Sequence, residues 1–190
     1  MRGVEQIPWA YDALCAVLEA TGLARWRAWL VSGARGRTLD LGCGTGRNLA
    51  LLFVDAVGID PSRHSLRRAR RRAPSIPLVR ASAEALPFRA GAFDTVLSAL
   101  VFCSVPRPAL GLAEVRRVLA PGGSLRMLEH VRSTSRWKAW VQDKLQPAWT
   151  WIAGGCHPNR ETEAAVERAG FVLEERRARS NMRRFTAAVK

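Results

Sequence analysis

The segment that decides the fold is Leu39-Asp40-Leu41-Gly42-Cys43-Gly44-Thr45-Gly46-Arg47-Asn48, in a chain of 190 residues. Its first residues are typical of a short buried strand, and its glycines permit the positive φ angles of a tight turn. When a strand leads through such a turn into a helix, backbone amides point at whatever the turn binds. The segment therefore predicts a ligand-binding turn at one edge of an α/β sheet.

The spacing of the glycines separates two kinds of cofactor. A dinucleotide-binding turn has the pattern G-x-G-x-x-G or A, whereas Gly46 comes one place early and Arg47 stands where a small residue belongs. Asp40 would repel the pyrophosphate of a dinucleotide and attract an ammonium group. S-adenosylmethionine has that ammonium group and no phosphate, so the turn favours S-adenosylmethionine.

A second acidic residue follows the next expected strand. The segment Val57-Gly58-Ile59-Asp60 places Asp60 14 positions after Gly46. An acid at this strand end can accept hydrogen bonds from both hydroxyls of an adenosine ribose. Alternatively, Asp60 caps the N-terminus of the helix that follows. Both interpretations remain open from the sequence.

Apolar, strand-like runs alternate with helical patterns along the chain, which is typical of an α/β sheet. We expect strands over residues 37–41, 55–60, 78–81, 95–100, 124–130, 171–175 and 185–189. Helices are expected over residues 47–53, 62–73, 108–119 and 159–169, the last with Asn159 as its N-cap. Right-handed crossovers between these elements predict a three-layer sandwich.

The two acidic motifs resemble the first two motifs of the class I methyltransferase superfamily. The likeness continues through residues 82–88, 93–96 and 119–123, and it covers about residues 37–131. It implies a Rossmann-like, mostly parallel seven-stranded sheet with the last strand antiparallel. It also implies that S-adenosylmethionine lies across the carboxyl ends of the strands, with S-adenosylhomocysteine as the product.

The motifs and the resemblance together predict which residues contact the cofactor. The family usually has Asp where Ser82 stands, so Ser82 would accept the adenine hydrogen bond as a shorter, neutral group. Tyr11 would cover the methionine end of the cofactor. The predicted cofactor-binding residues are Asp40, Gly42, Cys43, Gly44, Gly46, Asn48, Asp60, Pro61, Ser82, Ala83, Ser98 and Tyr11.

A narrower likeness indicates the acceptor. Residues 100–105, 114–119, 128–131, 137–149, 154–156 and 160–162 resemble the small thiol methyltransferases known as the methyltransferase-like seven group. This implies S-methylation of a small, apolar thiol. Related bacterial sequences are also similar to quinone and phospholipid methyltransferases, so a quinone, a phenol or a phospholipid amine is the alternative acceptor.

The acceptor also determines whether a base is needed. A thiol with a pKa of ~8.5 is partly ionised near neutrality, whereas a carbon or hydroxyl acceptor requires a base. The candidate base is His130 at the end of the fifth strand, where ligands collect in open α/β sheets. The alternative is a structural histidine whose hydrogen bonds are satisfied. Glu129 is expected on the opposite face of the strand.

Two segments outside the alternation, residues 9–31 and 136–157, contain all seven tryptophans. The first segment is expected to form two helices, and the second to break at Pro147. The rings either pack in the core or cover an apolar substrate; a third alternative is docking on a membrane surface. Trp137, Trp149 and Cys103 are the candidate substrate-pocket residues.

The length indicates one domain. We expect a helical cap (1–36), a cofactor-binding core (37–131), a tryptophan-rich substrate cover (132–158) and a closing helix and strand pair (159–190). No apolar stretch reaches the ~18 residues of a membrane span, and no signal peptide is visible, so a cytoplasmic protein is expected. The four cysteines, Cys15, Cys43, Cys103 and Cys156, are scattered without a C-x-x-C, so neither a disulfide framework nor a metal site is expected.

The formal net charge of +14 comes almost entirely from arginine. Such a charge could attract nucleic acid or an anionic membrane, but it is also typical of solvated helix faces, which is the interpretation we favour. An RNA-binding protein that retains the fold is the remote alternative. Enzymes that methylate the amino groups of nucleic-acid bases have an N-P-P-Y-like motif after the fourth strand. This chain has Ser98-Ala99-Leu100 there instead, which argues against that activity. The expected partner is therefore a small-molecule acceptor, with peripheral membrane contact as an option and the oligomeric state left open.

Overall fold

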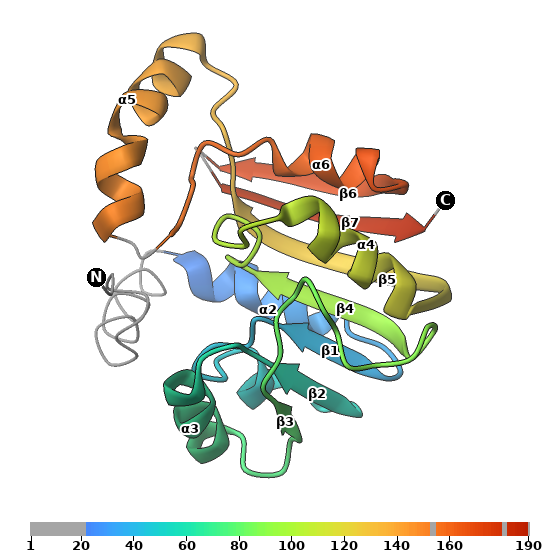
Figure 1. Cartoon of the computed structure of the whole chain (residues 1–190). Helices are drawn as coiled ribbons and strands as arrows, with labels where there is room; N and C mark the ends of the chain where they lie inside the picture. Colours follow the sequence, from blue (N-terminus) through green and yellow to red (C-terminus); the bar gives the residue numbers. More distant parts are fainter. Residues whose placement is uncertain (1–21, 153–154, 180–181, 190) are drawn as a thin grey trace.

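The structure is a computed structural model that describes residues 22–152, 155–179 and 182–189. Seven strands form one sheet in the order β3-β2-β1-β4-β5-β7-β6 (Figure 1). The strands are β1 (Thr38–Leu41), β2 (Ala56–Ile59), β3 (Leu78–Val79), β4 (Phe93–Ala99), β5 (Leu119–His130), β6 (Phe171–Arg179) and β7 (Met182–Val189). Neighbouring strands from β3 to β5 are parallel, and β7 runs antiparallel to both β5 and β6. The predicted sheet with its reversed last strand is confirmed.

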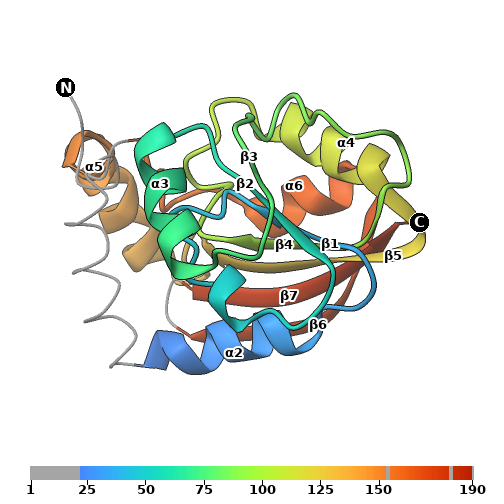
Figure 2. The same cartoon turned by 90° about the horizontal axis from the view of Figure 1, so that it is seen from below.

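Helices on both faces of the sheet complete three layers. The described helices are α2 (Ala24–Ser32), the 3-10 helix η3 (Leu49–Leu51), α3 (Arg63–Arg72), α4 (Pro108–Val118), α5 (Arg136–Ile152) and α6 (Thr162–Arg168). Figure 2 shows α2 on one face of the sheet and α4 and α6 on the other. None of the helices in the described part of the chain is long and apolar enough to cross a membrane.

The alternation of side chains along the strands supplies apolar contacts to both helical layers. In β4, Val96 belongs to the large core beneath α4 and α6, whereas its neighbour Leu97 packs with Leu30 of α2. All three side chains are fully buried. Central strands buried on both faces explain why the sequence shows continuous apolar runs rather than alternation.

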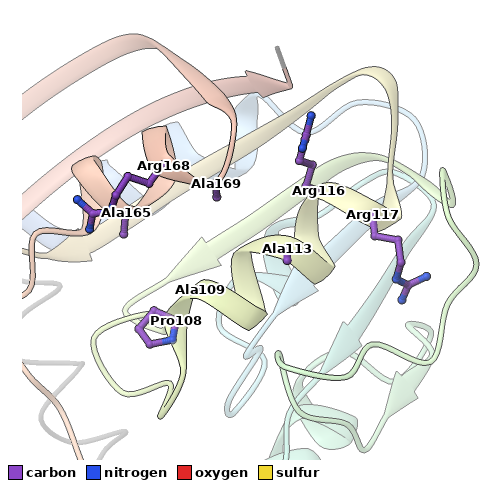
Figure 3. A pocket seen from close by; sticks show the side chains of 8 residues that line it. All are labelled: Pro108, Ala109, Ala113, Arg116, Arg117, Ala165, Arg168 and Ala169. Atoms are coloured by element: carbon purple, nitrogen blue, oxygen red, sulfur yellow. The ribbon is translucent and has the colours of Figure 1, made fainter.

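The two helices of the second layer leave a hollow between them. It has a volume of about 650 Å³ and is lined by Pro108, Ala109, Ala113, Arg116, Arg117, Ala165, Arg168 and Ala169 (Figure 3). Alanines supply much of its wall, so the two helices do not fill the space between them. None of the predicted site residues lines this hollow, and we assign it no role.

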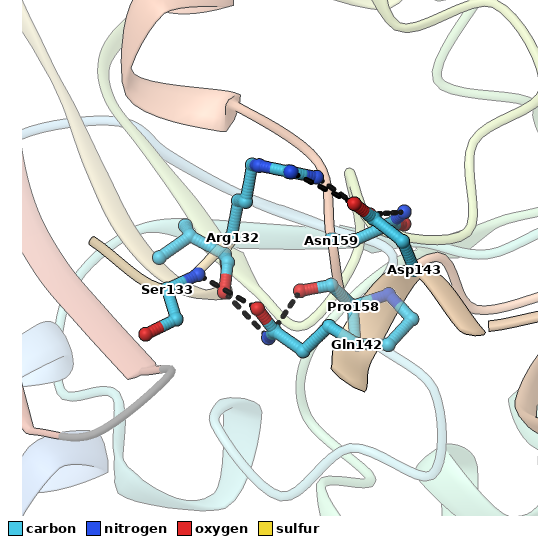
Figure 4. Close-up of polar contacts among 7 residues, drawn as sticks. Arg132, Ser133, Gln142, Asp143, Pro158 and Asn159 are labelled. Carbon is cyan, nitrogen blue, oxygen red and sulfur yellow. Dashed lines mark hydrogen bonds and ion pairs between the residues drawn. The ribbon is translucent and has the colours of Figure 1, made fainter. Parts of the chain in front are cut away.

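The long helix α5 extends from the sheet and is fastened at its first half (Figure 4). Both guanidinium nitrogens of Arg132 donate to the Asp143 carboxylate, at 2.5 and 2.8 Å, and Asn159 donates to the same carboxylate at 2.9 Å. Gln142 donates to the carbonyls of Val131 and Pro158, at 3.2 and 3.3 Å. The helix is thereby joined both to the end of β5 and to the segment that follows α5.

Three local expectations about helices are wrong. The helix expected over residues 159–169 begins at Thr162, because the Asn159 side chain binds Asp143 and caps no helix. The helix expected over residues 47–53 shrinks to the single 3-10 turn η3. α5 continues through Pro147, although proline removes one helical hydrogen bond. Contacts on both sides of the proline, from Gln142 before it and Thr150 after it, hold the helix in place.

Candidate cofactor and acceptor site

The glycine turn after β1 has the backbone that the sequence predicts. Gly42, Gly44 and Gly46 have φ angles of 62°, 55° and 82°. A Cβ atom on Gly42 would lie 2.6 Å from the Val101 side chain, and one on Gly46 would lie 2.9 Å from the Cα atom of Ala69 in α3. Glycine is therefore required both by the left-handed backbone and by the close approach of α3 and the loop after β4.

A pocket of about 680 Å³ opens at the carboxyl ends of the parallel strands. It lies where the strand order reverses between β1 and β4, which is the usual ligand-binding position in open α/β sheets. Six predicted cofactor-binding residues line it: Gly42, Gly44, Asp60, Pro61, Ser82 and Ala83. Further lining residues that were not predicted to bind include His64, Arg80, Leu100, Val101, Ser104 and Val105. The volume suits a small molecule of cofactor size.

Asp60 directly follows β2, lines the pocket and contacts the glycine turn. Its Oδ2 accepts a hydrogen bond from the Gly44 amide at 3.0 Å, and its Oδ1 accepts one from the Ser62 amide at 2.8 Å. Burial raises the pKa of Asp60, and these two backbone bonds oppose that rise. The N-cap of α3 is Ser62, whose Oγ accepts from the Ser65 amide, so the alternative in which Asp60 caps this helix is wrong.

Asp40 and Asn48 lie beneath the turn in a buried polar network. Asp40 Oδ1 accepts from Asn48 Nδ2 at 2.7 Å, and Asn48 Oδ1 accepts from the guanidinium of Arg27. Asp40 is fully buried, and within the described residues its Oδ2 has no hydrogen-bond partner. Burial raises the pKa of Asp40 to about 7, against the lowering effects of Asn48 and Arg27. A buried acceptor without a partner beside the turn fits the ammonium group of S-adenosylmethionine. Arg27 was not predicted from the sequence.

Ser98 has a different environment from the predicted one. It is fully buried, and its Oγ donates to Glu129 Oε1 at 3.0 Å. The same carboxylate oxygen accepts the amides of Val101 and Phe102, at 2.9 and 3.0 Å. The Ser98 side chain therefore holds Glu129 rather than lining the pocket. Burial raises the pKa of Glu129, and Glu129 fixes the turn that follows β4.

That turn contains the one non-glycine residue with positive φ among the described residues. Leu100 has a φ angle of 59°, its amide donates to the Leu128 carbonyl at 2.7 Å, and it lines the pocket. A left-handed conformation is costly for a residue with a Cβ atom and is often found at functional sites. The turn after β4 is thus held in an unusual shape at the edge of the pocket.

Two cysteines and a histidine meet beside this turn. The ligand atoms of Cys103, His130 and Cys156 all lie within 4.8 Å of one another. Each cysteine is 1% exposed. The hydrogen bond from Cys103 lowers the pKa of the Cys156 thiol, with a further contribution from His130, against the effect of burial. The fold thus brings together two cysteines that lie 53 positions apart in the sequence.

The tryptophans of the described part of the chain divide into two groups. Trp26 and Trp29 pack beside the α2 core, where the guanidinium of Arg184 lies 5.7 and 4.7 Å from their ring centroids. The four rings of α5 are instead 43–66% exposed: Trp137, Trp140, Trp149 and Trp151. Core packing thus explains the first group and does not explain the second.

The two predicted pocket tryptophans have different positions. The Trp149 side chain also lowers the pKa of the Cys156 thiol, so Trp149 lies at the cysteine pair. Trp137 is 66% exposed and lies 12 residues earlier in the same helix, a distance of about 18 Å. Only Trp149 is brought to the candidate acceptor site. Tyr11 and Cys15 lie outside the described residues.

Comparisons with known proteins match this chain to methyltransferases. Residues 39–127 match the family model described as "Methyltransferase domain". The chain is 35% identical to the thiol S-methyltransferase TMT1B of Homo sapiens over 153 residues, which are 74% of this chain and 63% of that protein. It is 34% identical to the demethylmenaquinone methyltransferase of Renibacterium salmoninarum over 131 residues, 65% of this chain and 55% of that protein. The chain thus spans about three fifths of the length of these curated relatives.

A solved structure extends the likeness to the whole fold. An S-adenosylmethionine-dependent methyltransferase from Thermotoga maritima, described as a possible histamine N-methyltransferase, superposes with a TM-score of 0.70 at 22% identity. The match covers 86% of this chain and 87% of that one.

The sheet and its helices form the Rossmann-like fold of the solved methyltransferase structure. Residues 39–127 match the methyltransferase domain family. The residues around the pocket fit the cofactor, since the glycine turn, Asp60 and the buried Asp40 offer donors and acceptors at the carboxyl edge of the sheet.

Proposed function

We propose that this chain transfers a methyl group from S-adenosylmethionine to a small, apolar thiol. The observation that carries the proposal is the continuity of the pocket, which runs from the glycine turn and Asp60 to Ser104 and Val105 beside Cys103. In this proposal the cofactor binds at the end with the glycine turn, and the acceptor binds at the end with Ser104. The 35% identity with a human thiol S-methyltransferase supports the choice of a thiol.

On the cofactor side, the proposal assigns a role to each part of the turn. Asp60 accepts hydrogen bonds from the ribose hydroxyls, and Asp40 Oδ2 faces the ammonium group. Gly42 and Gly44 allow the backbone to approach the cofactor closely. Pro61, Ser82 and Ala83 surround the adenine end. Cys43, Gly46 and Asn48 act indirectly, because they pack or hydrogen-bond behind the turn.

On the acceptor side, the chain's residues align the acceptor and exclude water. Bound S-adenosylmethionine supplies a sulfonium methyl group that is already activated toward a nucleophile. The turn of Leu100 and Val101 lies between the cofactor end and the cysteine pair, where a thiol can approach in line with that methyl group. Such positioning is a large part of catalysis in group transfer.

The second candidate acceptor is a hydroquinone or phenol, favoured by the 34% identity with a demethylmenaquinone methyltransferase. Such a hydroxyl or ring carbon must lose a proton during the reaction, so a base is required. His130, at the end of β5, is the candidate. A thiol needs little help of this kind.

The acceptor is tested by assaying the full chain with S-adenosylmethionine against three acceptor sets: alkyl thiols of increasing length, hydroquinones and phospholipid amines. Formation of S-adenosylhomocysteine and of the methylated product is measured by mass spectrometry. We expect turnover of the thiols, which increases with apolar chain length. Turnover of a hydroquinone or an amine without any thiol turnover would contradict the proposal. Tight RNA binding that weakens steeply with salt, together with no methyl transfer, would favour the remote alternative.

A further inference from the structure

The cluster of Cys103, His130 and Cys156 has the composition of a metal site. Cys103 lies in the turn after β4, His130 ends β5, and Cys156 follows α5. Two thiolates and one imidazole are ligands that zinc prefers. Three protein ligands with a fourth position left open are typical of catalytic rather than structural zinc.

The distances are close to those of a tetrahedral zinc site. With Zn–S bonds of about 2.3 Å and a Zn–N bond of about 2.0 Å, two sulfurs lie ~3.8 Å apart and a sulfur lies ~3.5 Å from the nitrogen. The ligand atoms of the cluster lie within 4.8 Å of one another, and Cys156 Sγ is 4.0 Å from His130 Nδ1. Movements of about 1 Å or less would bring all three atoms to bonding distance.

Hydrogen bonds of the backbone hold the two cysteines in this arrangement. The amide of His157 donates to the Cys103 carbonyl at 2.8 Å, which joins the two cysteine segments directly. Thr150 of α5 donates to the Cys156 carbonyl at 3.0 Å. On the other side, Glu129 accepts the amide of Phe102, next to Cys103. The cysteines are therefore positioned by three separate elements, as a preorganised site requires.

The charge around the cluster also suits a thiolate-bound dication. The guanidinium of Arg160 donates to the Phe102 and Val105 carbonyls and acts electrostatically on both cysteines. A bare dication would be repelled by this guanidinium. A zinc ion bound by two thiolates has no net charge, so Arg160 does not oppose it.

We propose that Cys103, His130 and Cys156 bind one zinc ion and that its open fourth position faces the acceptor end of the pocket. Ser104 lines that pocket, and its Oγ lies 3.7 Å from Cys103 Sγ, which places the cluster next to the pocket. The role in the reaction rests on the proposed function: the open position takes the acceptor thiol. His130 then acts as a ligand rather than as a base.

The step balances without any oxidant or reductant. The acceptor thiol loses its proton to solvent as the zinc–sulfur bond forms, since a coordinating thiol is deprotonated. Its sulfur then forms the bond to the methyl carbon, and the sulfonium carbon–sulfur bond breaks. That electron pair stays on the departing sulfur of S-adenosylhomocysteine. The methylated thioether is a weaker ligand and leaves the metal unchanged.

Metal binding is tested on the full chain, purified under reducing conditions and freed of metal with a chelator. Zinc is titrated by calorimetry, and cobalt(II) is used as a spectroscopic substitute. We expect one equivalent of metal and an absorption band of thiolate-to-cobalt charge transfer. Cys103→Ser and Cys156→Ser should each lower zinc affinity by at least ~100-fold, more than the loss of an outer-shell partner. Cys43→Ser and His157→Gln are matched controls that should keep the affinity.

Several outcomes would overturn the site. The first is the absence of a charge-transfer band in the wild-type chain, and the second is undiminished zinc binding by both serine variants. The third is a chain that forms a Cys103–Cys156 disulfide and still binds no metal once that disulfide has been reduced. The wild-type spectrum needs no variant, so the test holds even if a serine variant fails to fold.

The reaction role is tested separately from the proposed function. Chelator treatment should abolish thiol turnover while calorimetry shows unchanged S-adenosylmethionine affinity, and added zinc should restore turnover. Full thiol turnover by the metal-free chain would overturn the zinc role and leave the proposed function intact. Zinc binding without turnover of any thiol would contradict the proposed function and leave the metal site intact.

Discussion

At the scale of single residues, Asp60 combines two tasks that usually belong to different side chains. Its carboxylate fixes the Gly44 and Ser62 amides, and it lines the pocket. The two amides keep the turn in shape, and the proposed function assigns the same carboxylate to the ribose. The strand end alone predicts an acid here, but only the structure shows that the same acid organises the glycine turn.

Replacing Asp60 with Ala should weaken S-adenosylmethionine binding by about 10- to 100-fold. Hydrogen bonds to a charged group contribute about 1.5–3 kcal/mol, and 1.4 kcal/mol corresponds to a tenfold change. The measurement is calorimetric titration with S-adenosylmethionine. Asp55→Ala is the matched control, because the Asp55 side chain is 76% exposed, pairs with Arg37 and precedes the same strand. Equal affinity of wild type and Asp60→Ala would contradict the assigned role.

At the scale of elements, α5 exposes aromatic rings that packing in the core does not explain. Trp140 and Trp151 are 60% and 65% exposed, and the helix also contains Arg136, Lys138 and Lys144. Large aromatic rings next to basic residues are typical of helices that lie on an anionic membrane surface. The contacts of Arg132 with Asp143 would hold the helix in place on such a surface (Figure 4).

We therefore expect the chain to co-sediment with vesicles that contain phosphatidylglycerol. The double variant Trp140→Ala, Trp151→Ala should bind at least tenfold more weakly, since keeping a large apolar side chain from the apolar phase costs about 1.5–3 kcal/mol and about 1.4 kcal/mol is tenfold. Binding should also decrease as salt screens the basic residues. Phe53→Ala is the control, because Phe53 is 96% exposed but lies outside α5. Equal binding by the double variant would show that α5 is not the contact surface.

At the scale of the whole molecule, buried acids beneath the site reduce stability at neutral pH. Asp40 is fully buried, and its pKa is raised from 3.8 to about 7. The folded state therefore binds more protons than the unfolded state between these two values, and stability falls as pH rises through this window. With 1.36 kcal/mol per pKa unit, the ionised Asp40 costs roughly 4 kcal/mol above pH 7.

The variant Asp40→Asn should be more stable than wild type at pH 8, and the difference should shrink by about 2 kcal/mol or more at pH 5. The amide keeps an oxygen that can accept from Asn48 but has no proton to lose. Urea unfolding at the two pH values measures both free energies. Asp60 and Glu129 also have raised pKa values, so only the difference between wild type and variant isolates Asp40. A difference that does not change with pH would contradict the assignment.

Much of the fold and half of the site could be predicted from the sequence. The positions of the strands along the chain, the glycine turn and Asp60 follow from local patterns, because apolar runs and positive φ angles depend on neighbouring residues. The errors are also local in origin. Asn159 looks like a helix cap until Asp143, 16 residues away, takes its side chain. Ser98 looks like a cofactor contact until Glu129, 31 residues away, accepts its hydrogen bond.

The sequence by itself predicted a methyltransferase-type sheet and a glycine turn suited to S-adenosylmethionine. Only the tertiary structure decided that Cys103, His130 and Cys156 share one place. The physical reason is that β4 and β5 are parallel neighbours whose carboxyl ends lie at the same edge of the sheet. The segment after α5 then returns to that edge, where the His157 amide donates to the Cys103 carbonyl. No local pattern encodes a meeting of residues this far apart, because it arises from the packing of whole elements.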